Sequence, residues 1–501
     1  MEQKLNELKA RLIEAYDLKS AAGVLAWDQG TYMPPGGAEA RGRQMATLER
    51  LAHVKLTDPA IERLLDALQP WAEGLGYDSD EASLVRITRR QYERDTRVPP
   101  SFVARLTEHQ ARSFSAWATA RPRNDFPAVQ PFLEKTLGLS QEYANYFPGY
   151  EHIADPLIDR NDYAMKASTL RDLFCRLRER LVPMVQAITA QPPAGDACLH
   201  RTFPRPAQEA FLTEITRDLG YDWIRGRMDV SPHPMTISLS VTDVRITVRY
   251  RENDLGEALF SAIHEGGHAM YEQGVNPAYD GTPLGNGTSS GVHESQSRLW
   301  ENVVGRSRGF WRYYYPKLQS AFPGQLGDVS LDTFYRAINK VERSLIRTDA
   351  DEVTYNLHVM LRFGLELDLL EGKLAVRDLP EAWRERFQAD LGVAPPDDRD
   401  GVLQDIHWYF AHIGGMFQGY TLGNILGAQF FDAALRAHPE IPTEIEQGRF
   451  STLLGWLREN IYQHGSKYNT AELVQRVTGG PLRIEPYIEY LRSKYAGLYS
   501  F

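Results

Sequence analysis

The sequence has few cysteines and no long hydrophobic run. Only two of its 501 residues are cysteine, Cys175 and Cys198, so neither a disulfide framework nor a cluster of thiolate metal ligands can hold the fold together. No stretch approaches the roughly 18 consecutive apolar residues of a membrane-spanning helix. The N-terminus, MEQKLNE, also lacks the basic and then apolar segments of a signal peptide. These features predict a soluble cytoplasmic protein with no membrane partner.

An excess of positive charge is also missing. The chain carries 56 Lys and Arg against 66 Asp and Glu, a formal net charge of -10. Because the two signs are interleaved along the chain, no basic surface is indicated that would attract nucleic acid or an anionic membrane. A nucleic-acid partner is therefore not expected.

What the chain does contain is helical periodicity. Apolar residues recur at helical spacing from Leu5 onward and again in four later segments: residues 167 to 190, 330 to 346, 353 to 371 and 425 to 436. The exception is the segment 236–250, where apolar and polar residues alternate as in a small β-hairpin. We expect a mainly α fold with two lobes, a helical N-terminal lobe or lid (1–230) and a catalytic lobe with the small sheet (231–501). The two lobes are expected to form one continuous domain, 1–501.

A candidate metal site lies in the middle of the chain. Asp254 and Glu257 form a capping box, Gly274 offers a C-terminal stop, and the run HEGGH lies between them. On such a helix His264 and His268 are four residues apart and project from one face, so that two imidazoles can reach one ion. The spacing predicts a metal-binding helix.

The residues inside this run also have specific implications. Glu265 stands beside the histidines, where a carboxylate can act on a metal-bound water. Gly266 and Gly267 follow it and together cost about 2 kcal/mol of helix propensity relative to alanine. That cost is unusual in a helix that exists only for packing, and we expect the close approach of another backbone to explain it.

A third ligand must come from another segment. The extended pattern with a histidine six residues after the second one fails, because Tyr271 and Gly274 occupy its glycine and histidine positions. The glycine-rich loop 281–291 leads into His293 and Glu294 at the start of an apolar-striped helix, which makes Glu294 the candidate. Two histidines, one glutamate and an open position form a catalytic zinc set. Zn²⁺ is therefore predicted, although the same ligands accept cobalt or manganese.

Structural explanations exist for the same residues. His264 and His268 could be ordinary buried histidines, Glu265 a solvated acid, and Glu294 the helical partner of Arg298.

Two further patterns are weaker. His407 and His412 are five residues apart and do not share a helix face, so structural or substrate-contact roles are favoured over metal ligation. The loop 281–291 has no lysine after its glycines, which argues against a phosphate-binding loop.

Several longer motifs resemble those of the carboxypeptidase Taq type, or thermostable carboxypeptidase 1-like, metallocarboxypeptidases. The resemblance covers nearly the whole chain, and besides HEGGH it rests on His293-Glu294-Ser295-Gln296, Asp243-Val244-Arg245-Ile246-Thr247 (DxRxT), Ile346-Arg347-Thr348-Asp349-Ala350-Asp351 (IRxxAD), Gly401-Val402-Leu403-Gln404-Asp405-Ile406-His407-Trp408 (GxxQDxHW), and the opening segments Trp27-Asp28-Gln29 and 33–41. In one departure, His233-Pro234-Met235 stands where the family has His-Pro-Phe.

The resemblance implies a neurolysin-like helical fold with a deep groove, a homodimer, a zinc or cobalt ion, and the stepwise release of C-terminal amino acids from peptides. An exopeptidase needs a fixed cation for the terminal carboxylate of its substrate, and an arginine fork suits that task. Arg347 is the first candidate and Arg245 the second. Salt bridges to Asp349 and Asp243, respectively, are the structural alternative.

The remaining roles concern proton transfer and substrate contact. Glu265 is expected to take a proton from the metal-bound water and to hand it to the leaving amine. Tyr420 is the candidate donor to the negative oxygen that forms, although a tyrosine in an aromatic-rich segment can simply pack. His233 and His407 are expected to contact substrate, with Gln404 and Asp405 lining the groove or supporting ligands from behind; this last assignment rests on the motifs.

Two other functions compete with this interpretation. A helical oligopeptidase or dipeptidyl carboxypeptidase would share the metal site and differ in where the carboxylate-binding arginine lies. A non-catalytic helical binding protein would be indicated by the loss of a ligand or of the catalytic acid, but His264, Glu265, His268 and Glu294 are all present.

Overall fold

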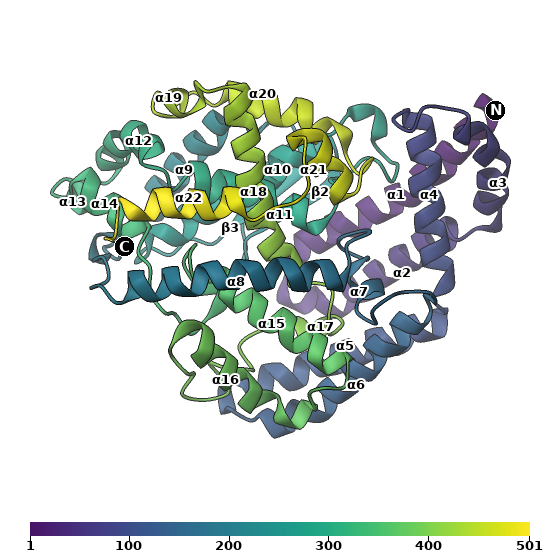
Figure 1. Ribbon diagram of the computed structural model, residues 1–501. Helices are drawn as coiled ribbons and strands as arrows, with labels where there is room; N and C mark the ends of the chain where they lie inside the picture. Colours follow the sequence, from purple (N-terminus) through teal and green to yellow (C-terminus); the bar gives the residue numbers. More distant parts are fainter. Residues whose placement is uncertain (501) are drawn as a thin grey trace.

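The computed structural model describes residues 1–500 and consists mostly of helices around one small sheet. In Figure 1 the sheet and helix α10 lie near the centre of the molecule, with helices on all sides. The helices that precede the sheet are α1 Glu2–Thr31, α2 Ala38–Leu56, α3 Pro59–Glu73, α4 Asp80–Arg97, α5 Pro100–Ala120, α6 Phe126–Asn145, α7 Asp155–Ile158, α8 Ala167–Thr189 and α9 Arg205–Leu219. The expected mainly α fold is confirmed.

The sheet has three strands in the order β1-β3-β2. Strand β2 (Met235–Ser240) pairs antiparallel with β3 (Asp243–Val248), so the predicted hairpin is confirmed. Strand β1 (Met228–Val230) pairs parallel with β3 and was not predicted. Three residues are too few to show an alternating pattern in the sequence.

The second half of the chain continues as helices. They are α10 Leu255–Gly274, α11 Ser290–Arg298, the π-helical segment η5 Leu299–Val304, α12 Arg308–Ala321, α13 Pro323–Leu326, α14 Leu331–Ile338, α15 Tyr355–Leu370, α16 Leu379–Leu391, α17 His407–Phe410, α18 Gln418–Ala437, α19 Ile441–Ile445, α20 Ser451–Asn460, α21 Thr470–Thr478 and α22 Glu485–Ala496. None of the helices within residues 1–500 combines the length and the apolarity that crossing a membrane requires.

Most of the predicted helical segments are confirmed, and one is too long. Helices α8, α15 and α18 cover the stripes at 167–190, 353–371 and 425–436, but α14 ends at Ile338 rather than near residue 346. The side-chain amide of Asn339 donates to the carbonyls of Tyr335 and Arg306. These bonds satisfy carbonyl groups at the helix end and turn the chain away from helix geometry.

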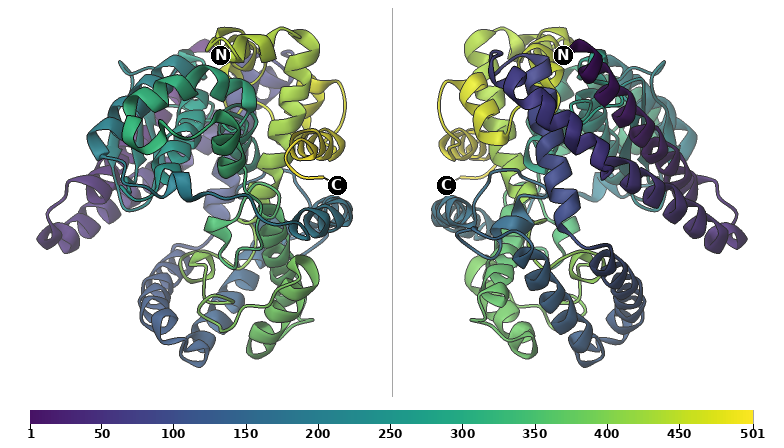
Figure 2. Two further views of the ribbon diagram at one scale, coloured as in Figure 1. Left: turned by 90° about the vertical axis from the view of Figure 1, so that its left-hand side faces the viewer. Right: turned by 90° about the vertical axis from the view of Figure 1, so that its right-hand side faces the viewer.

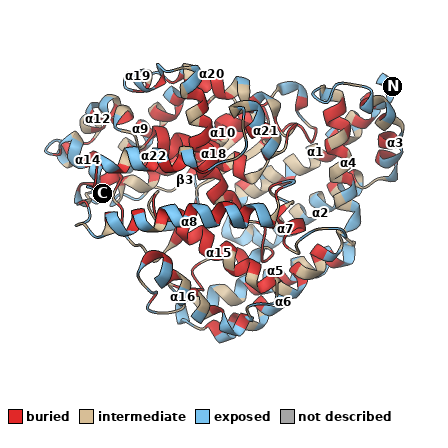
Figure 3. Ribbon diagram, in the orientation of Figure 1, coloured by how far each residue is buried: buried red, intermediate tan, exposed pale blue. Residues whose placement is uncertain are grey.

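Two hydrophobic cores hold the helices together. The larger core draws residues from Phe102 to Tyr499, and the smaller one joins α1, α3 and α4 to Val241, Val275 and Leu284. Figure 3 shows α18 buried along most of its length at the centre, while α8 is buried on one face only. Both cores cross residue 230, and the division of the chain into lobes near that residue stays a prediction.

Helices α1 and α2 form a long hairpin that projects from one side of the body, as both views of Figure 2 show. Helix α1 also lies against strand β2, where the Ser20 hydroxyl donates to the Leu239 carbonyl at 2.6 Å. The N-terminal helices are thereby attached to the strand that lies beside the HEGGH helix.

Candidate metal centre and active site

Helix α10 carries the HEGGH run between the ends that the sequence predicts. The Asp254 side chain caps it by accepting from the backbone N–H groups of Gly256 and Glu257, at 2.9 and 3.3 Å, and the helix ends at Gly274. The other half of the predicted capping box, a bond from the Asp254 backbone N–H to the Glu257 carboxylate, is wrong. The Glu257 carboxylate instead accepts from Arg249 Nε at 2.7 Å, because Arg249, one residue after the end of β3, lies within reach and carries the opposite charge.

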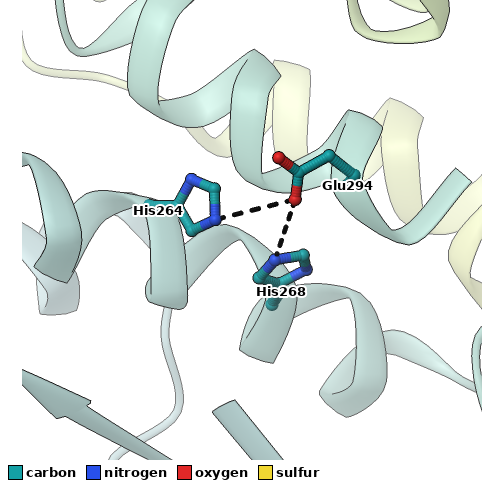
Figure 4. A group of neighbouring side chains, drawn as sticks. All are labelled: His264, His268 and Glu294. Carbon is teal, nitrogen blue, oxygen red and sulfur yellow. Dashed lines mark ion pairs between the residues drawn. The ribbon is translucent and has the colours of Figure 1, made fainter. Parts of the chain in front are cut away.

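Three side chains converge beside this helix. His264 Nε2 lies 3.7 Å and His268 Nε2 lies 3.4 Å from Glu294 Oε2, which comes from α11. Figure 4 shows both imidazoles on one face of α10, pointing at the same carboxylate oxygen. The other carboxylate oxygen, Oε1, accepts from Arg298 Nε at 2.7 Å, while Oε2 faces the histidines and also accepts from the Ser297 hydroxyl at 3.1 Å.

This arrangement fits one metal ion. One ligand atom from each of the three residues lies within 4.8 Å of the other two. Tetrahedral zinc with bonds of about 2.0–2.1 Å needs ligand atoms about 3.4 Å apart, close to the two separations between histidine and glutamate. Glu294 is 7% exposed, and the pKa of its carboxyl is lowered: burial opposes this, but Arg298 and the two histidines outweigh it. Glu294 is therefore ionised, and together with two neutral imidazoles it is suited to a divalent cation.

Each histidine is held through its other ring nitrogen. His264 Nδ1 lies 2.9 Å from Glu301 Oε2. His268 Nδ1 lies 2.6 Å from His293 Nδ1, and His293 Nε2 lies 2.7 Å from Glu272 Oε1. When His264 Nδ1 donates its proton to Glu301 and His268 Nδ1 donates its proton to His293 Nδ1, the Nε2 lone pairs of His264 and His268 are free for a metal. These contacts orient both rings toward Glu294.

Glu301 reaches His264 because the helix changes its winding there. The segment Leu299–Val304 is π-helical, with Gly305 N–H donating to the Trp300 carbonyl five residues back. Arg298 Nη1 and Arg306 Nη2 both contact the Glu301 carboxylate, at 3.2 and 3.3 Å. Burial acts against ionisation, but these arginines and His264 lower the pKa of Glu301 to about 2.

Replacing Glu301 tests this support directly. We expect Glu301→Gln to weaken metal affinity about 10–100-fold, because residues that orient metal ligands typically contribute that much. The measurement is competition for the metal against a coloured chelator, with Glu446→Gln as the matched control, since Glu446 pairs with Arg312 on the surface. Unchanged affinity in Glu301→Gln would contradict the role given to this carboxylate.

The catalytic candidate Glu265 is fixed by the sheet. The Thr236 hydroxyl, on β2, contacts Glu265 Oε2 at 2.6 Å and the Glu265 carbonyl at 3.0 Å. Glu265 is 7% exposed, and burial raises the pKa of its carboxyl, while the His264 charge and the Thr236 bond act in the opposite direction. A carboxylate with a raised pKa is a stronger base, which suits proton transfer near neutral pH.

The two glycines of HEGGH have different surroundings. A Cβ on Gly267 would lie 2.7 Å from the Gln296 carbonyl oxygen and 2.7 Å from Ser297 Cα, whereas one on Gly266 would meet only Thr216 Cγ2, at 3.9 Å. The close backbone approach that the sequence predicts is confirmed for Gly267 and wrong for Gly266. Helix α10 packs directly on α11 at Gly267, which brings Glu294 to the histidines.

This difference gives a matched pair of variants. We expect Gly267→Ala to destabilise the protein by about 1–3 kcal/mol, because the added carbon overpacks the α10–α11 contact. Gly266→Ala should be neutral or stabilising by up to about 1 kcal/mol, because alanine favours helix. Melting temperatures of the metal-free proteins measure both effects. Equal shifts in the two variants would show that the contact of Gly267 with α11 leaves no less room for a methyl group than the surroundings of Gly266.

A large groove opens on the His264 side of the cluster. It has a volume of about 690 Å³, and its lining includes His233, His264, Arg298, Arg347 and Tyr355. The side chain of Arg347 is buried, with Nη2 2.8 Å from Asp405 Oδ1 and Nη1 3.0 Å from Tyr355 Oη. Five N–H donors are available on a guanidinium, so Arg347 keeps capacity for a further anion in the groove.

Two other candidates lie behind Arg347. His407 Nε2 is 3.2 Å from the Tyr420 hydroxyl, and His407 Nδ1 is 3.6 Å from Asp405 Oδ1. Burial raises the pKa of Tyr420, so it stays protonated and able to donate. The Gln404 side-chain oxygen accepts from the Arg347 backbone N–H at 2.9 Å. These four residues thus form one polar cluster with Arg347.

Arg245 lies elsewhere. Its Nε and Nη2 donate to the Asp243 carboxylate at 2.8 and 2.7 Å. Its guanidinium carbon lies 4.7 Å from the centre of the Trp27 ring on helix α1. The described lining of the large groove includes Arg347 and His264 but not Arg245, so the structure places Arg347, and not Arg245, in the same groove as His264.

Several supporting residues were not predicted from the sequence. Thr236, Glu272, Arg298 and Glu301 all hold a candidate ligand or the catalytic acid in place. Only Arg298 left a signal in the sequence, as the possible helical partner four residues after Glu294. Glu301 lies in the π-helical segment, where the α-helical spacing does not hold. Thr236 and Glu272 are brought close by the packing of separate segments.

The fold and this cluster define the class: a helical metallopeptidase with the HEGGH glutamate beside two histidines and a third carboxylate from another helix. Residues 7–495 match the model of the family described as "Carboxypeptidase Taq (M32) metallopeptidase". The chain therefore belongs to the carboxypeptidase Taq family, and it is a metal-dependent carboxypeptidase.

Individual relatives agree along the whole length. The chain is 42% identical to thermostable carboxypeptidase 1 of Thermus thermophilus over 494 residues, covering 96% of each chain. It is 35% identical to carboxypeptidase 1 of Bacillus subtilis, covering 96% of this chain and 95% of that one. Among solved structures, the M32 carboxypeptidase of Deinococcus radiodurans R1 superposes with a TM-score of 0.96 at 47% identity, covering 100% of both chains. The resemblance inferred from the motifs is confirmed.

Proposed function

We propose that this metallocarboxypeptidase binds one divalent ion, Zn²⁺, through His264 Nε2, His268 Nε2 and Glu294 Oε2. The observation that carries the assignment is the convergence of these three atoms while both Nδ1 atoms are engaged elsewhere. Two imidazoles, one carboxylate and an open position are the ligand set of catalytic zinc. Co²⁺ is the alternative ion, because the same ligand types accept it.

Glu265 is assigned as the general base and acid. When bound, a divalent cation lowers the pKa of a water molecule towards 7 and polarises the scissile carbonyl. Glu265 takes the proton of the attacking water at the oxygen that the Thr236 hydroxyl leaves free. It then delivers that proton to the nitrogen of the leaving amino acid. The Thr236 contact keeps the carboxylate from rotating away between these two transfers.

Tyr420 is assigned as the donor to the developing negative oxygen. Its hydroxyl lies beside His407. Gly423, three residues later on helix α18, packs so closely on Glu294 that an added Cβ would meet the Glu294 side chain, which places Tyr420 near the metal ligands. A neutral, buried hydroxyl can donate to an oxyanion without first releasing a proton. His407 orients it through the 3.2 Å contact.

Arg347 is assigned to the terminal carboxylate of the peptide. It lines the same groove as His264, and Asp405 holds its planar fork in place. Such a fork binds a carboxylate through two parallel N–H bonds. His233 lines the same groove and contacts the released residue. Arg245, whose Nε and Nη2 both donate to Asp243 and whose guanidinium lies over Trp27, instead fastens helix α1 to the sheet.

The test is a product analysis with a short N-blocked peptide, with and without a chelator, read by mass. Successive loss of single C-terminal residues, abolished by the chelator and restored by one equivalent of Zn²⁺, is the expected result. Dipeptide or internal products would move the protein to the oligopeptidase alternative. Cleavage that the chelator does not affect would contradict the metal assignment.

We also propose a cytoplasmic homodimer. The family resemblance supports the dimer, and the two unpaired cysteines, Cys175 exposed and Cys198 buried, are compatible with a reducing compartment. Sedimentation of the purified protein reports the oligomeric state. A monomer at micromolar concentration would rule out the dimer.

A further inference from the structure

A second cavity, lined by arginine, lies beside the catalytic helices. Its volume is about 200 Å³, and its lining combines helix α4, the turn after α7 and the glycine-rich loop 281–291. Figure 1 shows α4 and α7 on the side of the molecule that holds the N-terminal helices. Arg90 and Arg94 come from α4 and Arg160 from the turn, whereas Asp159 is the acidic residue in the described lining. The wall thus carries a net positive charge.

Two of these arginines have no close acidic partner. Among residues 1–500 no carboxylate oxygen lies within 4.0 Å of the Arg90 or Arg160 guanidinium, and Arg94 has only its sequence neighbour Asp95, at 3.7 Å. The guanidinium carbon of Arg90 lies 3.7 Å from the centre of the Tyr163 ring. An aromatic face positions a guanidinium but leaves its in-plane N–H donors free for an anion.

The positive charges also act on one another. Burial lowers the pKa of Arg90 and of Arg160, and the neighbouring Arg94 charge lowers both further, while Asp159 acts in the opposite direction on Arg90 and Asp95 on Arg160. Arginine nevertheless remains protonated in proteins. Three charged guanidinium groups around one small cavity are therefore stabilised by an anion that reaches all of them.

The cavity lies in the direction that the substrate must take. With its terminal carboxylate at Arg347, on the His264 side of the metal ligands, the rest of the peptide extends past His268. On that side a Cβ on Gly287 would lie 3.0 Å from His293 Cδ2, so this loop residue touches the histidine that holds His268. Gly287 also lines the arginine cavity.

Strand β2 gives the distance. It runs from Thr236, which holds Glu265, to Ser240, about 14 Å away at 3.4 Å per residue, or four residues of extended peptide. Ser240 and Asn286 line an intervening cavity of about 310 Å³, and Asn286 also lines the arginine cavity. A peptide along β2 thus reaches this adjoining cavity about four residues before the bond that is cut, and the arginines lie beyond it.

We propose that Arg90, Arg94 and Arg160 form a subsite for a carboxylate side chain of the peptide, several residues upstream of the bond that is cut. The proposal rests on the assignment of Arg347 to the terminal carboxylate, which sets the direction of the peptide. It makes peptides with an upstream Asp or Glu the preferred substrate class. A carboxylate side chain and free phosphate are both small anions, so phosphate competes for the same arginines.

The test uses neutral N-blocked heptapeptides in which one residue, from the second to the sixth before the C-terminus, is Glu or Gln. For wild-type enzyme we expect kcat/KM to be about tenfold or more higher for Glu than for Gln at one or two adjacent positions, because charge-assisted hydrogen bonds are the strong ones. The Glu/Gln ratio should fall toward one in Arg90→Gln/Arg160→Gln. It should persist in Arg89→Gln, a control on the same helix whose arginine pairs with Asp66.

A competition arm needs no variant. Inorganic phosphate should lower kcat/KM more for the favoured Glu peptide than for its Gln counterpart, because only the Glu peptide also uses the arginine cavity. A Glu/Gln ratio near one at every position, a ratio that survives in the double variant, or equal effects of phosphate on both peptides would each overturn the subsite. Release of C-terminal residues from the Gln peptides reports the carboxypeptidase activity independently, so failure of the subsite and failure of the proposed mechanism are distinguishable.

Discussion

Glu265→Gln is expected to lower kcat by about 10²–10⁴, the range that general acid–base catalysis contributes. Glutamine has the same shape and can still accept the Thr236 hydroxyl, but it cannot take a proton from water. The side chain is buried and points at no metal-ligand atom among the described contacts, so the variant should fold and keep its metal. Steady-state rates with a short N-blocked peptide, alongside metal analysis, measure both properties.

Two controls make this result specific. Thr236→Val removes the hydroxyl that orients Glu265. It should lower kcat less, by about tenfold, because only the hydrogen bond to the carboxylate is lost and the carboxylate itself remains. His264→Gln should instead lose the metal. Glu265→Gln with near-normal kcat would contradict the assignment of the base, and loss of metal from Glu265→Gln would place Glu265 among the ligands.

Arg347→Met is expected to lower kcat/KM by a hundredfold or more, because removing one partner of a buried charged pair typically costs about 2–5 kcal/mol. Asp405 keeps Arg362 as a partner after the change, so its charge does not become isolated. The loss should fall on substrates with a free C-terminal carboxylate. Kinetics with a free and an amidated version of one peptide measure it.

The two peptides separate binding from folding damage. Wild-type enzyme should prefer the free carboxylate strongly, and Arg347→Met should lose that preference. The matched variant is Arg245→Met, which removes the bonds to Asp243 and the contact with Trp27 and should keep the preference for the free acid. If Arg245→Met loses the preference while Arg347→Met keeps it, the two assignments must be exchanged.

The sequence predicts the candidate metal ligands better than the residues that hold these ligands in place. Helix periodicity and the HEGGH spacing are local features, so they place His264 and His268 on one face of a helix with capped ends. Glu294 required a motif from a second helix. The contact that unites them depends on Gly267, whose missing side chain lets α11 approach, and only its cost in helix propensity was visible beforehand.

Features made by tertiary contact were missed for the same physical reason. Thr236 holds Glu265 across the boundary between a strand and a helix, and the π-helical segment that presents Glu301 has no local sequence signature. Strand β1 is short and parallel, so it has no hairpin turn to announce it. Arg245 matches a family motif, and of its two interpretations from the sequence the fold favours the salt bridge with Asp243.

The central claim is that three atoms on two helices hold the catalytic ion. Anomalous diffraction from crystals of the enzyme loaded with Zn²⁺, recorded at the zinc edge, tests it most directly. The account predicts one strong peak about 2.0–2.2 Å from His264 Nε2, His268 Nε2 and Glu294 Oε2. A peak bound by other residues would contradict it. So would a peak that remains in Glu294→Gln but is held by residues other than His264 and His268.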